Sequence, residues 1–131
     1  MTEVRKRIMI VDDDIDSLNQ MKFHVESFGF DTLVAEGQKD AESLLETEKP
    51  DLAIFDLMME NKDSGFILGY KIKKRYPDVP VIIASAVTAE TGMVFGLDTE
   101  EERSWIKADQ YLEKGIRPDQ LQREINKLLK L

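Results

Sequence analysis

The chain has 131 residues, with 18 Lys and Arg against 26 Asp and Glu, so its formal charge is −8 with the single histidine neutral. This length is typical of one compact domain. The acidic balance disfavours nucleic acid and anionic lipid as partners, because both bind clustered Lys and Arg. The absence of cysteine excludes disulfides, thiolate zinc sites and cysteine nucleophiles. Because no apolar run reaches the ~18 residues of a membrane span, we expect a cytoplasmic protein without a membrane partner.

Short apolar runs alternate with segments whose hydrophobic residues recur at helical spacing. The runs predict strands at residues 8–11, 32–35, 52–55, 79–84 and 110–112. The third run is apolar throughout, which is typical of a central strand in a parallel sheet covered on both faces. The fourth run contains Pro80, which we expect at the start of the strand.

The segments between the runs predict helices. The first carries an apolar stripe, has Asp14 or Asp16 to cap its start and ends at Gly29. The stripe comprises Ile15, Leu18, Met21, Val25 and Phe28. Further stripes comprise Ala41, Leu44 and Leu45; Phe66, Ile67, Tyr70 and Ile72; and Leu121, Ile125, Leu128 and Leu129. Residues 87–109 predict one helix or a loop with a short helix. Strands alternating with helices predict an α/β fold, a doubly wound parallel sheet of five strands with five helices.

Polar side chains follow four of the predicted strands. Asp12 and Asp13 follow the first strand, Asp56 the third, Ser85 the fourth and Lys114 the fifth. In a doubly wound sheet these side chains converge where such folds bind ligands. Three converging carboxylates repel each other unless a cation compensates them, and Mg²⁺ is a hard cation that prefers oxygen ligands. The sequence therefore predicts a magnesium site.

An acidic metal site with a lysine and a hydroxyl is typical of phosphoryl transfer. No glycine-rich loop follows the first strand to hold a nucleotide. We therefore expect an aspartate of the chain itself to accept the phosphoryl group. Asp56 is the best candidate, because it ends the most apolar strand beside the predicted metal ligands.

The ordered motifs resemble a known family. Asp12-Asp13, Asp56-Leu57-Met58-Met59, Ser85-Ala86 and Tyr111-Leu112-Glu113-Lys114 together resemble the receiver domain of two-component response regulators. The resemblance spans residues 7–131. It implies a flavodoxin-like fold with strand order 2-1-3-4-5.

The resemblance also implies roles for these residues. Asp56 would receive a phosphoryl group from a histidine kinase, a histidine phosphotransfer protein or a small phosphodonor. Asp13, Asp56 and the backbone carbonyl of Met58 would bind Mg²⁺, and Asp12 would act mainly through a water molecule.

Three further residues match the family's signalling positions. Ser85 and Lys114 resemble the groups that bind the phosphoryl oxygens. Ser85 and Tyr111 resemble the two switch residues, which move inward when the acceptor is phosphorylated. We expect His24 to be a surface histidine, and it is a poor phosphorelay candidate.

Some residues depart from the family pattern. Glu60 replaces a proline, Gly115 replaces a cis-proline after the lysine, and the segment 87–109 is longer than usual. The departures at Glu60 and Gly115 keep open a pseudo-receiver that binds partners without phosphorylation. A second alternative is a phosphohydrolase of the haloacid dehalogenase type. That class would need an acidic residue two positions after the nucleophile, where this chain has Met58.

The resemblance also implies that the residues two past the acceptor and two past the hydroxyl residue help or hinder an attacking water. Here these are Met58 and Val87. Because both are apolar and cannot orient water by hydrogen bonding, we predict slow autodephosphorylation.

We therefore predict a single receiver domain over residues 1–131, with no output domain. It would catalyse only its own phosphorylation and dephosphorylation, and would signal by binding a downstream protein. The sequence is compatible with a homodimer.

Overall fold

The protein is described by a computed structural model. The structure describes residues 5–57, 59, 64–85, 109–113 and 115–131, with the backbone alone for Ser85. The predictions for Met58, Lys114 and residues 86–108 lie outside this set.

Five parallel strands form one sheet in the order β2-β1-β3-β4-β5. The strands are β1 (Arg7–Val11), β2 (Asp31–Ala35), β3 (Leu52–Asp56), β4 (Val81–Ser85) and β5 (Gln110–Glu113). This order confirms the predicted fold class. It also places β1 directly beside β3, so that their carboxyl ends are neighbours.

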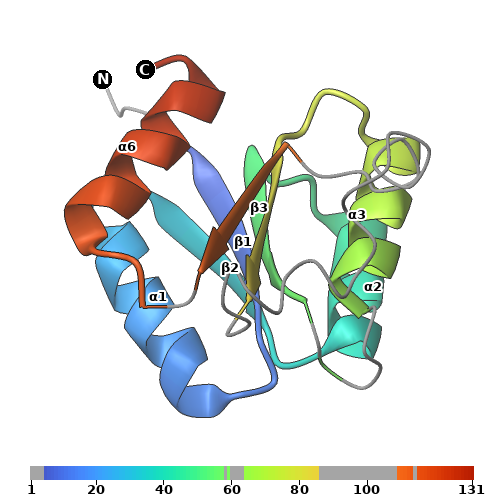
Figure 1. Cartoon of the computed structure of the whole chain (residues 1–131). Coiled ribbons are helices and arrows are strands. Elements are labelled where there is room, and N and C mark those ends of the chain that lie inside the picture. Colours follow the sequence, from blue (N-terminus) through green and yellow to red (C-terminus); the bar gives the residue numbers. More distant parts are fainter. Residues whose placement is uncertain (1–4, 58, 60–63, 86–108, 114) are drawn as a thin grey trace, which may run out of the picture.

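Helices cover both faces of the sheet (Figure 1). Helices α1 (Ile15–Ser27) and α6 (Pro118–Leu129) lie on one face, and α2 (Gln38–Thr47) and α3 (Ser64–Arg75) lie on the other. The remaining predicted helix falls in residues 87–109, of which the structure describes only Asp109. No helix in the described ranges is long and apolar enough to cross a membrane.

Two hydrophobic cores lie on opposite faces of the sheet, because alternate strand residues point to opposite sides. On β3, Ala53 and Phe55 pack toward α2 and α3. Leu52 and Ile54 pack toward α1 and α6. All four are buried, so β3 is held rigidly up to its last residue, Asp56.

Helix α1 begins and ends as predicted. The carboxylate of Asp14 accepts hydrogen bonds from the backbone amides of Asp16 (3.0 Å) and Ser17 (3.4 Å), which caps the helix. At the other end, Gly29 has a φ of +98° just after the C-cap Phe28.

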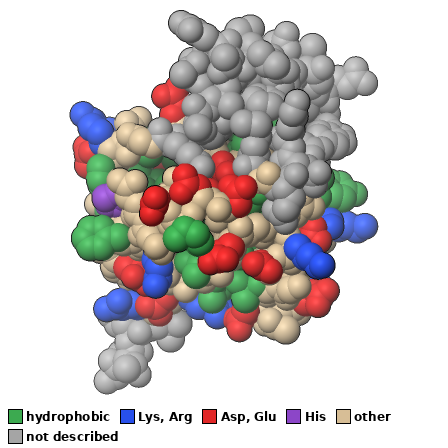
Figure 2. Space-filling view, turned by 90° about the horizontal axis from the view of Figure 1, so that it is seen from below, with side chains coloured by type: hydrophobic (Ala, Val, Ile, Leu, Met, Phe, Trp, Pro, Cys, Tyr) green, Lys and Arg blue, Asp and Glu red, His purple; other side chains and the backbone are tan. Residues whose placement is uncertain are grey.

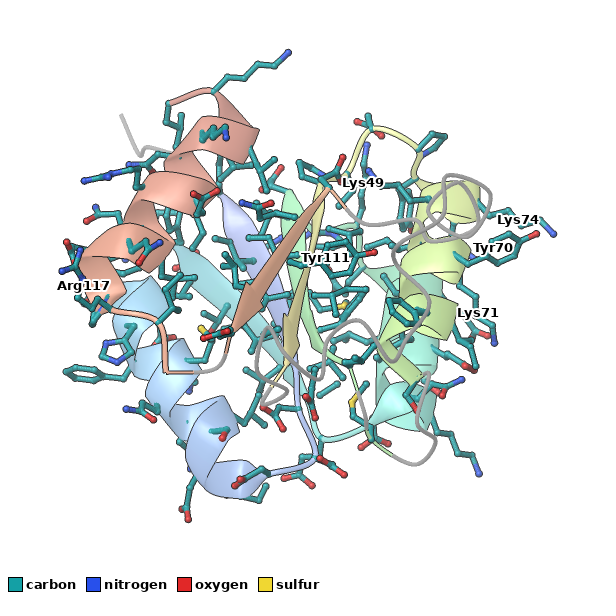
Figure 3. The ribbon with its side chains drawn as sticks, in the orientation of Figure 1. Lys49, Tyr70, Lys71, Lys74, Tyr111 and Arg117 are labelled. Atoms are coloured by element: carbon teal, nitrogen blue, oxygen red, sulfur yellow. The ribbon has the colours of Figure 1, made fainter. Side chains whose placement is uncertain are left out.

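Some sequence predictions were wrong in detail. Strand β4 begins at Val81, two residues later than expected, because Pro80 precedes the ladder and only its carbonyl binds, accepting from Ala53 (3.0 Å). Ile15 and Tyr70 belong to apolar stripes but are 46% and 49% exposed. Ile15 occupies the first position of α1, and Tyr70 projects outward from α3 (Figure 3).

Candidate functional site

Three carboxylates meet at the carboxyl ends of β1 and β3. One carboxylate oxygen from each of Asp12, Asp13 and Asp56 lies within 4.8 Å of the others. Asp12 and Asp56 are buried, at 6% and 7% exposure, whereas Asp13 is exposed. The predicted convergence of these side chains is therefore confirmed. Asp and Glu side chains gather on this side of the molecule (Figure 2).

Neighbouring backbone groups hold Asp12 in place. The Asp12 amide donates to the carbonyl of Ala35 on β2 (3.2 Å), which continues the pairing of β1 with β2 beyond the strand end. The Asp12 carboxylate accepts from the amide of Asp14 (2.9 Å). The three consecutive aspartates thus have different roles: Asp12 and Asp13 belong to the carboxylate cluster, and Asp14 caps α1.

Strand pairing holds Asp56 in place, as backbone hydrogen bonds do for Asp12. Asp56 lies opposite Ala84 of β4, and the next amide, that of Leu57, donates to the Ala84 carbonyl (3.0 Å). The backbone of Ser85 follows directly on β4, opposite Glu113 of β5. This register brings the end of β4 beside the acceptor candidate.

The donor set fits a hard divalent cation. Burying a charged carboxylate is costly without compensation, and bringing three together adds mutual repulsion. Mg²⁺ is usually held by one or two carboxylates and keeps several waters. The buried Asp12 and Asp56 with the exposed Asp13 offer such ligands beside solvent.

Tyr111 lies on β5 between the sheet and α3. Its ring makes an edge contact with the ring of Phe66, at 6.4 Å between centroids and 71° between planes. The side chain is 40% exposed, and burial of its remaining surface raises the pKa of Tyr111 to about 12. This half-buried ring is the part of the predicted switch that the structure describes.

Comparison with known proteins decides the family. The model of the response regulator receiver domain matches residues 8–126. The chain belongs to this family. As a receiver domain, it is a phosphoacceptor signalling switch of the two-component type.

The amino-acid sequence of this receiver domain is similar to parts of larger regulators. It is 26% identical over 127 residues to the alkaline phosphatase synthesis transcriptional regulatory protein PhoP of Bacillus subtilis, covering 97% of this chain and 50% of that protein. It is also 26% identical to the probable transcriptional regulator ycf27 of Cyanophora paradoxa, covering 96% of this chain and 49% of that protein. The chain spans about half the length of these curated relatives.

Solved receiver domains share its fold. A CheY-like receiver domain protein from Methanospirillum hungatei matches with a TM-score of 0.80 and 25% identity, covering 97% of this chain and 95% of that one. The Francisella response regulator 1452 receiver domain matches with a TM-score of 0.77 and 29% identity, covering 96% and 98%. The response regulator TrrA of Thermotoga maritima, solved in complex with Mg²⁺-BeF, matches in fold with a TM-score of 0.76 and 24% identity, covering 94% and 98%.

Several predicted site residues of this receiver domain remain untested. Lys114 and Met58 lie outside the described residues, as does the side chain of Ser85. Gly115, which follows Lys114, has a φ of +89°, a left-handed conformation that glycine adopts without strain.

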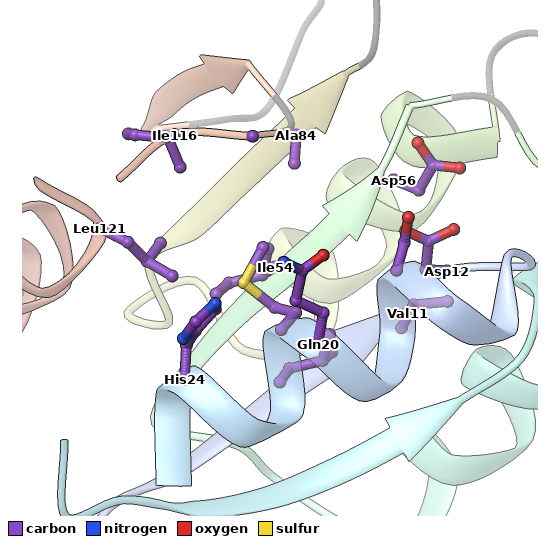
Figure 4. A pocket seen from close by; sticks show the side chains of 13 residues that line it. Val11, Asp12, Gln20, His24, Ile54, Asp56, Ala84, Ile116 and Leu121 are labelled. Carbon is purple, nitrogen blue, oxygen red and sulfur yellow. The ribbon is translucent and has the colours of Figure 1, made fainter. Parts of the chain in front are cut away.

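A cavity beside the carboxylates contains residues that sequence reasoning did not assign to the site. Its volume is about 580 Å³, including space open to solvent. Ser17, Gln20 and His24 line it from α1, and Asp12 and Asp56 line one end (Figure 4). His24 is half-buried at this cavity, so its expected surface position was only partly right. The 17, 20, 24 spacing places all three on one helical face and was the available signal.

Proposed function

We propose that Asp56 is the residue on which this receiver domain is phosphorylated, with Asp12 and Asp13 as its metal-binding partners. The observation that carries the proposal is the mutual approach of the three carboxylate groups within 4.8 Å. Asp13 and Asp56 would bind Mg²⁺ directly, and Asp12 through a water molecule. When bound, Mg²⁺ would neutralise charge on the carboxylates and on the phosphoryl oxygens.

The chain's own contribution to this reaction is to position the nucleophile. A carboxylate oxygen of Asp56 forms the new bond to phosphorus. The bond from phosphorus to the donor's nitrogen or oxygen breaks, and its electron pair leaves with the donor. Because Asp56 ends a strand that is buried on both faces, its carboxylate is held in place before the donor arrives.

The partners are proposed from the family. A histidine kinase or a histidine phosphotransfer protein would supply the phosphoryl group, and the output would be binding to a downstream protein. Ser85 and Lys114 would contact the phosphoryl oxygens, and Ser85 and Tyr111 would transmit the change. A cytoplasmic location is part of the proposal, and a chain without cysteine suits a reducing compartment.

The test uses acetyl phosphate and Mg²⁺, with the adduct measured by intact mass. We expect one phosphoryl group on the unaltered protein and none on Asp56→Asn. Asp13→Asn should weaken Mg²⁺ binding at least about tenfold, because even the groups that only orient metal ligands contribute about 10- to 100-fold to affinity. Asp14→Asn is the matched control, since it removes a neighbouring charge while asparagine still caps a helix well.

Two outcomes would contradict the proposal. An unmodified protein that binds neither phosphoryl group nor beryllofluoride would favour the pseudo-receiver. An adduct that persists in Asp56→Asn would place the acceptor at another residue.

A further inference from the structure

The start of α3 touches the backbone at the end of β3. At Gly65, a Cβ atom would lie 2.6 Å from the carbonyl oxygen of Asp56 and 2.8 Å from the Cα of Leu57. Both atoms belong to the backbone and cannot move aside as a flexible side chain does. Contacts this short are essentially never made by real Cβ atoms, so only glycine fits at position 65 without displacing one element from the other.

A hydrogen bond holds the two elements at this separation. The amide of Gly65 donates to the carbonyl of Leu57 (2.8 Å). On the other side, the amide of Leu57 donates to the carbonyl of Ala84 on β4 (3.0 Å). The backbone directly after Asp56 is thus bound on one side by the sheet and on the other by α3.

Buried packing makes this arrangement stiff. Ser64 and Phe66, on either side of Gly65, are 0% and 6% exposed, and Leu57 is 4% exposed. If a methyl group were added at position 65, helix α3 would therefore have no free space into which to shift. The displacement would fall on the junction between the end of β3 and the start of α3.

We propose that Gly65 is a positioning residue for the acceptor: by lacking a side chain, it lets α3 hold the backbone of Asp56 and so orients the carboxylate for metal binding and phosphoryl transfer. This inference rests on the proposed role of Asp56. Glycine is required at position 65 because of the limited space and not because of its backbone conformation. Gly29 and Gly115 are the opposite case, since they have positive φ angles and open space where a Cβ atom would lie.

The chain offers a matched control for the test. Gly29→Ala strains a left-handed backbone far from the carboxylates, where nothing lies within 4 Å of the added atom. Gly65→Ala adds the same methyl group beside Asp56. Mg²⁺ affinity by calorimetry, the phosphorylation rate at saturating Mg²⁺ and the melting temperature are measured for both.

We expect Gly65→Ala to weaken Mg²⁺ binding severalfold and to slow phosphorylation at saturating Mg²⁺ at least about tenfold, since small displacements of reacting groups have effects of this size. Gly29→Ala should lower the melting temperature and leave both other quantities within about twofold. A Gly65→Ala protein that melts earlier but keeps the Mg²⁺ affinity and the phosphorylation rate would overturn the proposal.

Amide hydrogen exchange on the unaltered protein tests the same contact without a variant. The Gly65 amide should exchange at a rate similar to the buried amides of β3, and exchange as fast as that of an exposed amide would overturn the proposal. Failure of the proposed function would be visible separately, as absence of phosphorylation in the unaltered protein.

Discussion

Charged side chains are arranged differently at the two ends of the sheet. At the amino ends of the strands, acids meet cations. The Arg7 guanidinium binds Glu48 (2.6 Å), and Lys73 binds Asp109 (2.7 Å). At the carboxyl ends, three carboxylates gather within 4.8 Å. Charge therefore fastens the strands at one end, whereas at the other it forms the cluster that we propose as the site for a cation and a phosphoryl group.

The amino-terminal pairs also hold backbone. The Asp51 carboxylate accepts from the Arg7 amide (2.8 Å), at the start of β1. The Asp109 carboxylate accepts from the Val81 amide (2.8 Å), at the start of β4. These acids satisfy donors that the ladder leaves open, which is a structural role. We assign Asp13 and Asp56 to the metal site instead, so their conversion to amides should affect function more than fold.

The largest expected effect is at Asp56. Asp56→Asn should abolish the phosphoryl adduct, while removing one of the three mutually repelling charges. In the absence of Mg²⁺ we expect the variant to be as stable as the unaltered protein or more stable, by up to about 1 kcal/mol. Urea denaturation in a chelating buffer measures this. A clear loss of stability would show that the carboxylate has a structural role like those at the amino ends.

The second effect concerns the metal. Because the folded state gathers the ligands and the unfolded chain does not, Mg²⁺ at ten times its Kd should stabilise the protein by about 1.4 kcal/mol. Thermal melts with and without Mg²⁺ measure the shift, and a chelator should reverse it. The shift should shrink in Asp13→Asn and persist in Asp14→Asn. Equal shifts in all three proteins would indicate a different metal site.

The third effect lies at the amino ends. Asp109→Ala removes the ion pair with Lys73 and the acceptor of the partly buried hydrogen bond from the Val81 amide. We expect a loss of about 1–2 kcal/mol in unfolding free energy. Phosphorylation by acetyl phosphate at a temperature where the variant is folded should change less than about twofold. A large loss of phosphorylation would contradict the division of roles between the two ends.

The smallest effect is a pH dependence at the exposed Asp78. Its hydrogen bond with Lys49 holds the pKa of that carboxyl below its usual 3.8. The lowered pKa means that the pair contributes stability above about pH 4 and loses it as the pH falls through the folded-state value. The Asp78 carboxyl of Lys49→Ala, followed by NMR, should titrate closer to 3.8. An unchanged titration would show that Lys49 does not set it.

Much of the fold followed from the sequence because apolar runs and helical stripes are local patterns. The meeting of Asp12 with Asp56 was also predictable, since both follow strands that a doubly wound sheet places together. The contact at Gly65 was not, because it depends on how closely α3 approaches β3, and no pattern in the sequence encodes that separation. The ion pair of Arg7 with Glu48 joins distant positions whose charges have many other possible partners.

The position of β1 in the sheet has a consequence for folding during synthesis. All three carboxylates lie within the first 56 residues, at the carboxyl ends of two strands that pair directly. Chains are made from the amino terminus, and local β-α-β units pair before distant strands. The part of the chain that carries the proposed metal ligands can therefore assemble while the strand that carries Tyr111 is still being made. Pulsed hydrogen exchange during refolding would show this as earlier protection of β1 and β3 than of β5.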